Sequence, residues 1–291
     1  MKTEGIMRRM TGKRALRALL GAVVLSGLSI NLALASGPNQ TPVTVYPSDA
    51  QGNRISQPGW WVVTAKPGTT TQLYAVVGDV SNRPAAIRVL AVDATDAMFG
   101  GLAYNLPSAR VHSVGRWIHL PTGNVSLTGG QGGVMPFKVV IPKGIKPGQY
   151  VGGVSAYVPS HDRQTSGKAQ VIIQPRVITA VVINVPGPKF FRLGVKNVQA
   201  QWMSGAFYIV PHLFNNGNQL LKGNGFMWVY APGHSKPIVA KAMPIDTTIP
   251  GQTFAYPLRW SSHPAKGTYH WLIKLHWNGG STSKSGTFVI R

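Results

Sequence analysis

The chain has 291 residues and a formal net charge of +22 at pH 7, from 29 basic and 7 acidic side chains, and it has no cysteine. Its 34 glycines and 22 prolines exclude a helical bundle or a coiled coil, which need long uninterrupted runs of helix-forming residues. The absence of cysteine excludes a disulfide scaffold, a cysteine-ligated zinc site, an iron–sulfur site and thiol catalysis.

The first 35 residues have the pattern of a secretory signal peptide. A basic segment over 2–17 precedes an apolar run over 18–35, and Ala33-Leu34-Ala35 forms a small-x-small cleavage site before Ser36. An uncleaved N-terminal anchor is the alternative. No later run approaches the roughly 18–20 apolar residues that a membrane helix needs. We therefore predict an exported, secreted protein.

The remaining chain, 36–291, is strongly basic. Removing the six basic and one acidic residues of the signal region leaves 23 basic and 6 acidic residues, a net charge of +17, and all six acids are aspartate. Such a charge attracts polyanions, which for an exported protein include teichoic acids, anionic lipid headgroups and acidic polysaccharides, whereas nucleic acid is an unlikely partner. A surface suited to an acidic medium is the alternative explanation.

Short β-rich runs bounded by Gly, Pro or Asn follow one another along the chain. In order they cover 60–65, 72–77, 86–92, 135–141, 150–158, 170–185, 206–214, 225–230, 253–260, 268–277 and 286–290. This spacing is typical of antiparallel β-sandwiches, and no window shows helical periodicity. We predict an all-β fold with two Ig-like antiparallel sandwiches in tandem.

An internal repeat supports the division into two sandwiches. A strand, a corner with Gly-x-Tyr and a second strand occur around Tyr150 and again around Tyr269, where each tyrosine hydroxyl is expected to satisfy nearby backbone. The best linker candidate is Val185-Pro186-Gly187-Pro188. The predicted units are the signal peptide (1–35), a first sandwich (36–186) and a second sandwich (187–291).

The chain shows little sign of catalytic chemistry. Asp93 and Asp96 are the closest pair of carboxylates, but their spacing of three does not place both on one face of a strand, so an Asx turn or a solvated loop is the favoured interpretation. His270 and His276 lie about 20 Å apart on a regular strand, too far to share a metal ion. We predict no catalytic residue, no metal and no cofactor, and a protein that is not an enzyme.

Five residues are candidate ligand contacts. Adjacent Trp60 and Trp61 point to opposite faces of a strand, so one of them is exposed and could stack on a sugar ring. If the odd-numbered face of 268–277 lies in the core, then His270, Lys274 and His276 form a cationic strip on the solvent side. The tryptophans at 202, 228 and 260 are expected to fill the second core.

The region over roughly 40–185 resembles the N-terminal domain of the WxL-interacting cell-surface proteins. The matching stretches are Lys66-Pro67-Gly68, Val80-Ser81-Asn82, the residues 91–96 followed by 100–104, and 141–142 continuing through 147–154. The resemblance implies a peptidoglycan-binding domain followed by a host-binding domain in a Gram-positive bacterium. Members usually end in a membrane helix with a basic tail, and this chain stops at Phe288-Val289-Ile290-Arg291.

Together these observations predict a cell-surface binding protein associated with the cell wall. The first sandwich would bind cell-wall polymer, either peptidoglycan or teichoic acid, and the second would bind another secreted or surface protein. The alternative is an exported two-sandwich chaperone, which uses an exposed edge strand to cap a strand of a secreted client. Further alternatives are a weak hydrolase or enzyme accessory module, and a structural surface-layer component.

Overall fold

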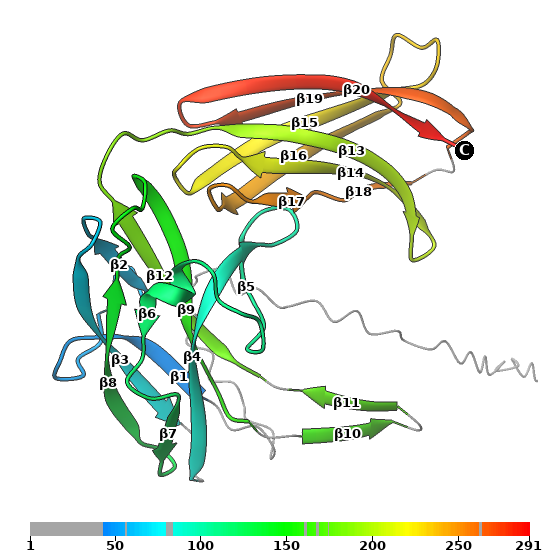
Figure 1. Ribbon diagram of the computed structural model, residues 1–291. Coiled ribbons are helices and arrows are strands. Elements are labelled where there is room, and N and C mark those ends of the chain that lie inside the picture. The colour runs from blue at the N-terminus through cyan, green and yellow to red at the C-terminus, as the bar shows by residue number, and fades with distance from the viewer. Residues whose placement is uncertain are drawn as a thin grey trace, which may run out of the picture.

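The structure is a computed structural model that describes residues 43–55, 57–79, 84–159, 162–166, 169–173, 175–261 and 264–291. The predicted signal peptide (1–35) and the 80–82 motif lie outside these residues. Figure 1 shows two β-sandwiches in tandem. The predicted all-β fold class is confirmed, since the described residues contain many antiparallel strands and one four-residue helix, α1 (Val114–Trp117). No helix in the described part of the chain is long and apolar enough to cross a membrane.

The first sandwich packs two sheets face to face. One sheet has the strand order β1-β3-β8-β6, and the other has β2-β12-β9-β4, with β5 and β7 both pairing with β4. The strands are β1 (Val43–Ser48), β2 (Trp61–Thr64), β3 (Thr70–Asp79), β4 (Ala85–Asp96), β5 (Leu102–Tyr104), β6 (Ile118–His119), β7 (Asn124–Leu127), β8 (Gly132–Val140), β9 (Gly148–Tyr157) and β12 (Val177–Val185). The pairs are antiparallel except β2 with β12, which is parallel.

The second sandwich also consists of two sheets. One sheet pairs β13 and β14, with β17 and β18 both following β14, and the other has the order β16-β15-β19-β20. Its strands are β13 (Leu193–Met203), β14 (Ala206–Asn215), β15 (Leu221–Tyr230), β16 (Val239–Thr248), β17 (Thr253–Ala255), β18 (Leu258–Trp260), β19 (Gly267–Trp277) and β20 (Gly280–Ile290).

Alternation along the strands decides which side chains form the two cores. In β8 the inward positions Met135, Phe137 and Val139 are buried, while the intervening positions face solvent. In β19 the odd-numbered face, from Tyr269 to Leu275, is buried as predicted. The first core draws its buried residues from 45–185 and the second from 193–288.

Both predicted tyrosine corners are present. The Tyr150 hydroxyl donates to the Lys146 carbonyl oxygen at 2.9 Å, and the Tyr269 hydroxyl donates to the Ala265 carbonyl oxygen at 2.8 Å. Each tyrosine therefore satisfies the carbonyl four residues earlier, at the same place in β9 and β19. The repeat seen in the sequence is a repeat of this local geometry.

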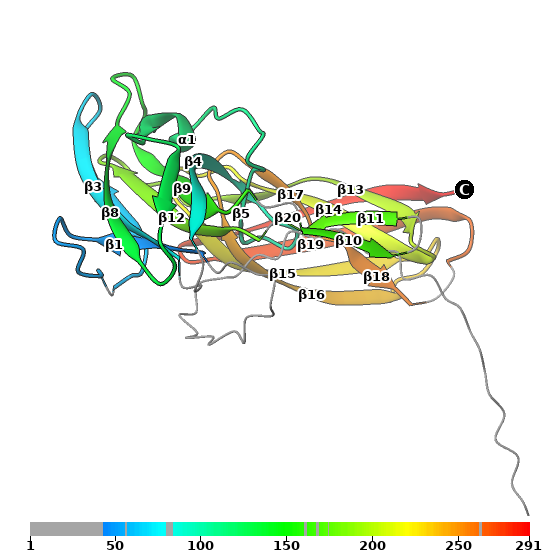
Figure 2. The ribbon, with the colours of Figure 1, turned by 90° about the horizontal axis from the view of Figure 1, so that it is seen from below.

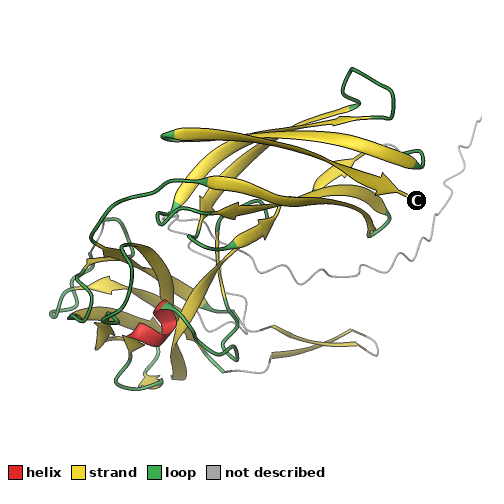
Figure 3. Cartoon of the chain, turned by 45° about the horizontal axis from the view of Figure 1, so that its top comes forward, coloured by secondary structure: helices red, strands yellow, loops and turns green. Residues whose placement is uncertain are grey.

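A two-stranded arm interrupts the first sandwich between β9 and β12. It consists of β10 (Asp162–Ser166) and β11 (Ala169–Ile173), which pair with each other in an antiparallel sheet of their own. Figures 1 and 3 show the arm projecting from one end of the first sandwich. Figure 2 shows it running in the direction in which the second sandwich extends. The predicted β-rich run over 170–185 therefore includes parts of two strands, β11 and β12, with Pro175 between them.

The expectation for the two closest aspartates is wrong. Asp93 and Asp96 lie in β4, and Asp93 is 5% exposed rather than solvated. Its carboxylate accepts hydrogen bonds from the backbone N–H groups of Ser113 and Gly115 at the start of α1, and from that of His112. The residues that satisfy this carboxylate lie about twenty positions along the chain, so a local turn pattern does not show them.

The two sandwiches meet along a continuous seam. A small apolar cluster joins Ala94, Val151 and Val182 of the first sandwich to Ile249 of the second. Backbone hydrogen bonds flank it, including the Gly101 N–H to the Thr247 carbonyl at 2.8 Å. The seam is therefore a packed interface and not only a linker connection.

Candidate functional site

The strand β12 has an edge that its neighbours cover only in part. On one side it pairs with β9 along its whole length, from Val177 to Val185. On the other side it pairs with β2 over Val181 to Asn184 only. The first residues of β12 therefore have no neighbouring strand in the described structure on that second side.

The alternation of backbone groups along β12 shows which N–H and C=O groups have no partner strand. The Asn184 carbonyl accepts a hydrogen bond from the Ala65 N–H, so Asn184 directs its backbone polar groups toward β2. In a strand these groups alternate between the two sides, so Ile178 also points its N–H and C=O to the β2 side. Because β2 begins its pairing at Val181, both groups of Ile178 are open to a further strand.

The side chains along β12 change from buried to exposed in the same region. On the core-facing side Val181 and Ile183 are fully buried, Thr179 is nearly so, and Val177 is 38% exposed. The Thr179 hydroxyl donates to the Val45 carbonyl at 2.6 Å, which ties this part of β12 to β1. The start of β12 is thus a firmly held strand at the margin of the core, with an apolar side chain left uncovered.

Arg176 fixes the position where the arm meets β12. Its guanidinium donates to the Asn105 and Tyr104 carbonyl oxygens at 2.7 and 2.9 Å, at the end of β5. Burial lowers the pKa of Arg176 from its ordinary value, and the nearby Tyr157 opposes that shift. The side chain remains a cation that bridges the arm and the sheet.

The arm prolongs the open edge. The strand β11 pairs only with β10, so its other side has no strand partner among the described residues. Figure 1 shows the arm lying beyond the end of β12 that begins at Val177. An extended segment of another chain could pair with this edge by β-augmentation.

The longer strands at the other open edges of the sandwich sheets carry residues that discourage such pairing. Proline removes a ladder donor and lysine introduces a charge, and both are common protections of exposed edges. They occur as Pro47 in β1, Pro136 and Lys138 in β8, Lys196 in β13, Lys241 and Pro244 in β16, and Lys284 in β20. The open part of β12, Val-Ile-Thr-Ala, has neither residue type. This contrast selects β12 as the candidate functional site.

The predicted tryptophan pair is divided between surface and core. Trp60 is 38% exposed, whereas Trp61 is 3% exposed and its indole N–H donates to the Tyr74 carbonyl at 3.1 Å. Trp61 also makes an edge-on contact with Phe137. Of the two, Trp60 is placed to meet a ligand, and its role stays a prediction.

The predicted cationic strip faces solvent on β19. His270, Lys274 and His276 are exposed at alternate positions of a regular ladder, and Lys274 lies 5.8 Å above the Trp228 ring. The structure does not gather the three into one pocket, and their binding role stays a prediction. Among the tryptophans expected in the second core, Trp260 is buried, whereas Trp202 is 53% exposed and Trp228 is half-buried outside that core, so the expectation is wrong for these two.

The residues at the β12 edge were missed by sequence analysis. Val177 and Ile178 look like ordinary core-strand residues, since the sequence does not reveal where β2 stops covering them. A signal was present in the 170–185 run, which is long for one strand and contains Pro175. Elsewhere, within the ranges that the structure describes, no cluster of three His, Cys, Asp or Glu could hold a metal ion.

Comparisons with known proteins give structural likenesses only. No protein-family model matches the chain, and no curated protein matches it. Among solved structures, the class 5 fimbriae chaperone CfaA is 14% identical with a TM-score of 0.35, covering 85% of this chain and 98% of its own. The E. coli chaperone DraB is 11% identical with a TM-score of 0.35, covering 86% and 98%. The CsuC–CsuE chaperone–adhesion subunit complex of Acinetobacter baumannii is 11% identical with a TM-score of 0.37, covering 78% and 94%.

These comparisons correct the predicted function. The three structures are described as chaperones or as a chaperone–adhesion subunit complex and none as a cell-wall-binding protein, and on this finding the prediction of a wall-binding surface protein is wrong. The same finding overturns peptidoglycan or teichoic acid as the partner, and association with the cell wall is not supported. The identities and TM-scores are too low to assign an activity to this chain. The resemblance to WxL-interacting proteins stays a prediction.

Proposed function

We propose that the protein is an exported, non-enzymatic chaperone that caps a strand of a secreted client protein. The observation that carries this proposal is the open, unprotected edge at the start of β12. The signal-peptide pattern at residues 1–35 supports export and therefore a client that is also exported.

The chemistry of capture would be backbone pairing. A client strand that adds to the β11 and β12 edge forms hydrogen bonds that each contribute roughly 0.5–1.5 kcal/mol net. Ordering the client segment opposes part of that gain, so capture is reversible. The exposed Val177 side chain supplies an apolar contact beside the new ladder. A chaperone needs this combination, because it must release its client.

The first test compares two substitutions at Ile178. Ile178→Pro removes the open N–H and closes the edge, whereas Ile178→Ala shortens the side chain and keeps the N–H. The probe is a set of overlapping 12-residue peptides that tile the exported proteins of the source organism, with binding measured by fluorescence polarisation. We expect the wild type and Ile178→Ala to bind a subset of the peptides, namely those in which apolar and polar residues alternate. Ile178→Pro should weaken that binding about tenfold or more, equivalent to about 1.4 kcal/mol.

The proposal fails if no peptide binds the wild type, or if the proline variant binds as tightly as the alanine variant. Thermal unfolding of both variants is the control. The Ile178 N–H makes no ladder bond within the protein, so the proline variant should retain the fold. Amide hydrogen exchange gives a second measurement, since a bound peptide should slow exchange at Ile178.

A further inference from the structure

The seam between the sandwiches is built around the end of β4. The Asp96 carboxylate oxygen Oδ1 accepts the Ile249 N–H at 2.8 Å. The Asp96 N–H donates to Gln252 Oε1 at 2.8 Å, and Gln252 Nε2 donates to the Ala94 carbonyl at 3.1 Å. Both partners belong to the second sandwich, so this carboxyl group forms part of the contact between the two sandwiches.

The surroundings of the Asp96 carboxyl group are apolar. Its second oxygen, Oδ2, is buried and has no hydrogen-bond partner. The neighbouring cluster consists of Ala94, Val151, Val182 and Ile249, with Leu102 packed against it. Among the described residues no basic side chain forms an ion pair with Asp96. A negative charge here would be buried without a counter-ion, which is costly in an apolar setting.

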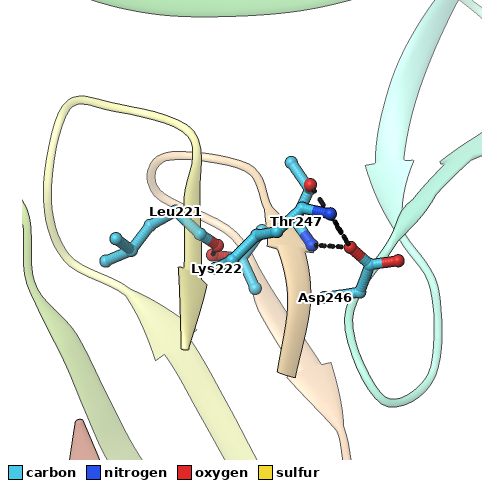
Figure 4. A network of polar contacts seen from close by, with 5 residues as sticks. Leu221, Lys222, Asp246 and Thr247 are labelled. Carbon is cyan, nitrogen blue, oxygen red and sulfur yellow. Dashed lines mark hydrogen bonds and ion pairs between the residues drawn. The ribbon is translucent and has the colours of Figure 1, made fainter. Parts of the chain in front are cut away.

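The other ionisable groups near the seam are neutral or already take part in ion pairs or hydrogen bonds. On β5, burial raises the pKa of Tyr104 to about 12, so this residue is neutral. On β16, Asp246 pairs with Lys222 at 2.9 Å and accepts the Thr247 N–H (Figure 4). Next to β12, Arg176 donates to the carbonyl groups that follow β5. The turn over 249–252 contains no charged residue, and on β4 Asp93 bonds to the start of α1.

We propose that the seam is a pH-sensitive hinge, closed while the Asp96 carboxyl group is protonated and loosened when it ionises. Three observations carry this inference: the buried unpartnered oxygen of Asp96, its other oxygen bonded to the Ile249 N–H, and the two bonds that join Gln252 to the backbone of Asp96 and Ala94. It is independent of the proposed strand capture, because it concerns how the two sandwiches are held together. A looser seam would change the direction of the second sandwich relative to the arm.

The direction of the pH effect follows from linkage. Burial raises the pKa of Asp96 from 3.8 to about 7, and the hydrogen bond from the Ile249 N–H opposes part of that rise. In an open seam the carboxyl group is hydrated and returns toward 3.8. The closed seam therefore binds the proton more tightly, and its advantage is complete below about pH 3.8 and lost as the pH rises to about 7. Within that window each pH unit changes the closed-to-open ratio by at most tenfold.

The experiment uses the absence of native cysteine. Ser126→Cys on β7 and Ser285→Cys on β20 introduce exposed labelling sites on the two sandwiches, and electron–electron double resonance measures the distance between spin labels there. We expect a narrow distance distribution at pH 5 that broadens by pH 8. Asp96→Asn, which cannot ionise, should keep the narrow distribution at both pH values. Asp49→Asn, at an exposed loop away from the seam, is the matched control and should broaden like the wild type.

A second measurement does not depend on any variant. The carboxyl ¹³C signals of the few aspartates can be followed by NMR as the pH changes, and one of them should titrate with a midpoint near 7. A wild-type distance distribution that is constant from pH 5 to 8, or a set of aspartates that all titrate below pH 5, would overturn the proposal. The proposal is also overturned if the distance distribution of Asp96→Asn broadens with the same pH midpoint as that of the wild type.

Discussion

At the scale of single residues, the scarce aspartates have defined structural roles. Asp49 accepts the N–H groups of Gln51 and Asn53, and hydrogen bonding, chiefly from the Asn53 side chain, lowers its pKa. Asp93 holds the start of α1, and Asp246 pairs with Lys222. In a chain so poor in acids, these carboxylates serve mainly as acceptors for groups of the protein itself.

Replacing Asp93 tests this role. Asp93→Ala leaves the part-buried N–H group of Ser113 and the buried N–H group of Gly115 without an acceptor, so the free energy of unfolding of the first sandwich should fall by about 3 kcal/mol. Urea denaturation followed by tryptophan fluorescence measures the change. Asp49→Ala, on an exposed loop, is the control and should lower the free energy of unfolding clearly less than Asp93→Ala does. Equal losses for both variants would contradict the assigned role of Asp93.

At the scale of elements, the open edge depends on how far each strand extends. Both β2 and β12 are ordinary β-rich segments, and their parallel pairing ends four residues short of the start of β12. The arm then continues the ribbon where the sandwich ends. A site of this kind is a length of strand edge without a neighbouring strand, and no single side chain identifies it.

Removing the arm separates its role from that of β12. Replacing residues 160–174 with Asn-Gly, which favours a tight hairpin turn, should leave the unfolding transitions of both sandwiches unchanged, because the arm pairs only with itself. Peptide affinity should fall, since β11 supplies part of the proposed edge. Circular dichroism and the peptide-binding assay provide the two measurements. Unchanged affinity would limit the site to β12, and a loss of folding would show that the arm supports the core.

At the scale of the whole molecule, close backbone contacts hold the two sandwiches together. A side chain at Gly100 would come within 2.8 Å of the Asp246 carbonyl oxygen, and Phe99 contacts the Tyr256 ring edge-on. The Gln149 N–H donates to the Asn218 carbonyl at 2.8 Å elsewhere along the seam. Such contacts fix the angle between the sandwiches more firmly than the short linker after β12 could.

A pair of glycine substitutions tests the seam. Gly100 and Gly233 both have positive φ, 84° and 72°, so alanine carries a similar backbone cost at each. Only Gly100 has a close neighbour across the seam, whereas a Cβ at Gly233 meets nothing within 4 Å. Small-angle X-ray scattering should show a larger radius of gyration for Gly100→Ala and no change for Gly233→Ala. Identical scattering from the two variants would show that the seam tolerates the added methyl group.

Much of the fold could be predicted because it depends on residues close together in the chain. Alternation placed Tyr269 and Trp271 of β19 in the core, and the Gly-x-Tyr pattern predicted that both tyrosine hydroxyls bond to nearby backbone, as the structure shows. The candidate site could not be predicted in the same way. Trp61 is buried because Phe137 and Tyr74 lie across the sandwich from it, and a sequence pattern does not contain that contact.

The sequence by itself determined the all-β architecture and the two tyrosine corners, since period-two alternation and short-range hydrogen bonds are local properties. It also showed the basic charge and the signal-peptide pattern, which depend on composition alone. Only the tertiary structure decided which edge stays open and which carboxyl group is buried. Pairing between residues 61 and 181, and the contact of Asp96 with Ile249 across 153 positions, arise when distant segments pack together. Those long-range contacts leave Ile178 without a neighbouring strand on the β2 side and place Asp96 in an apolar seam.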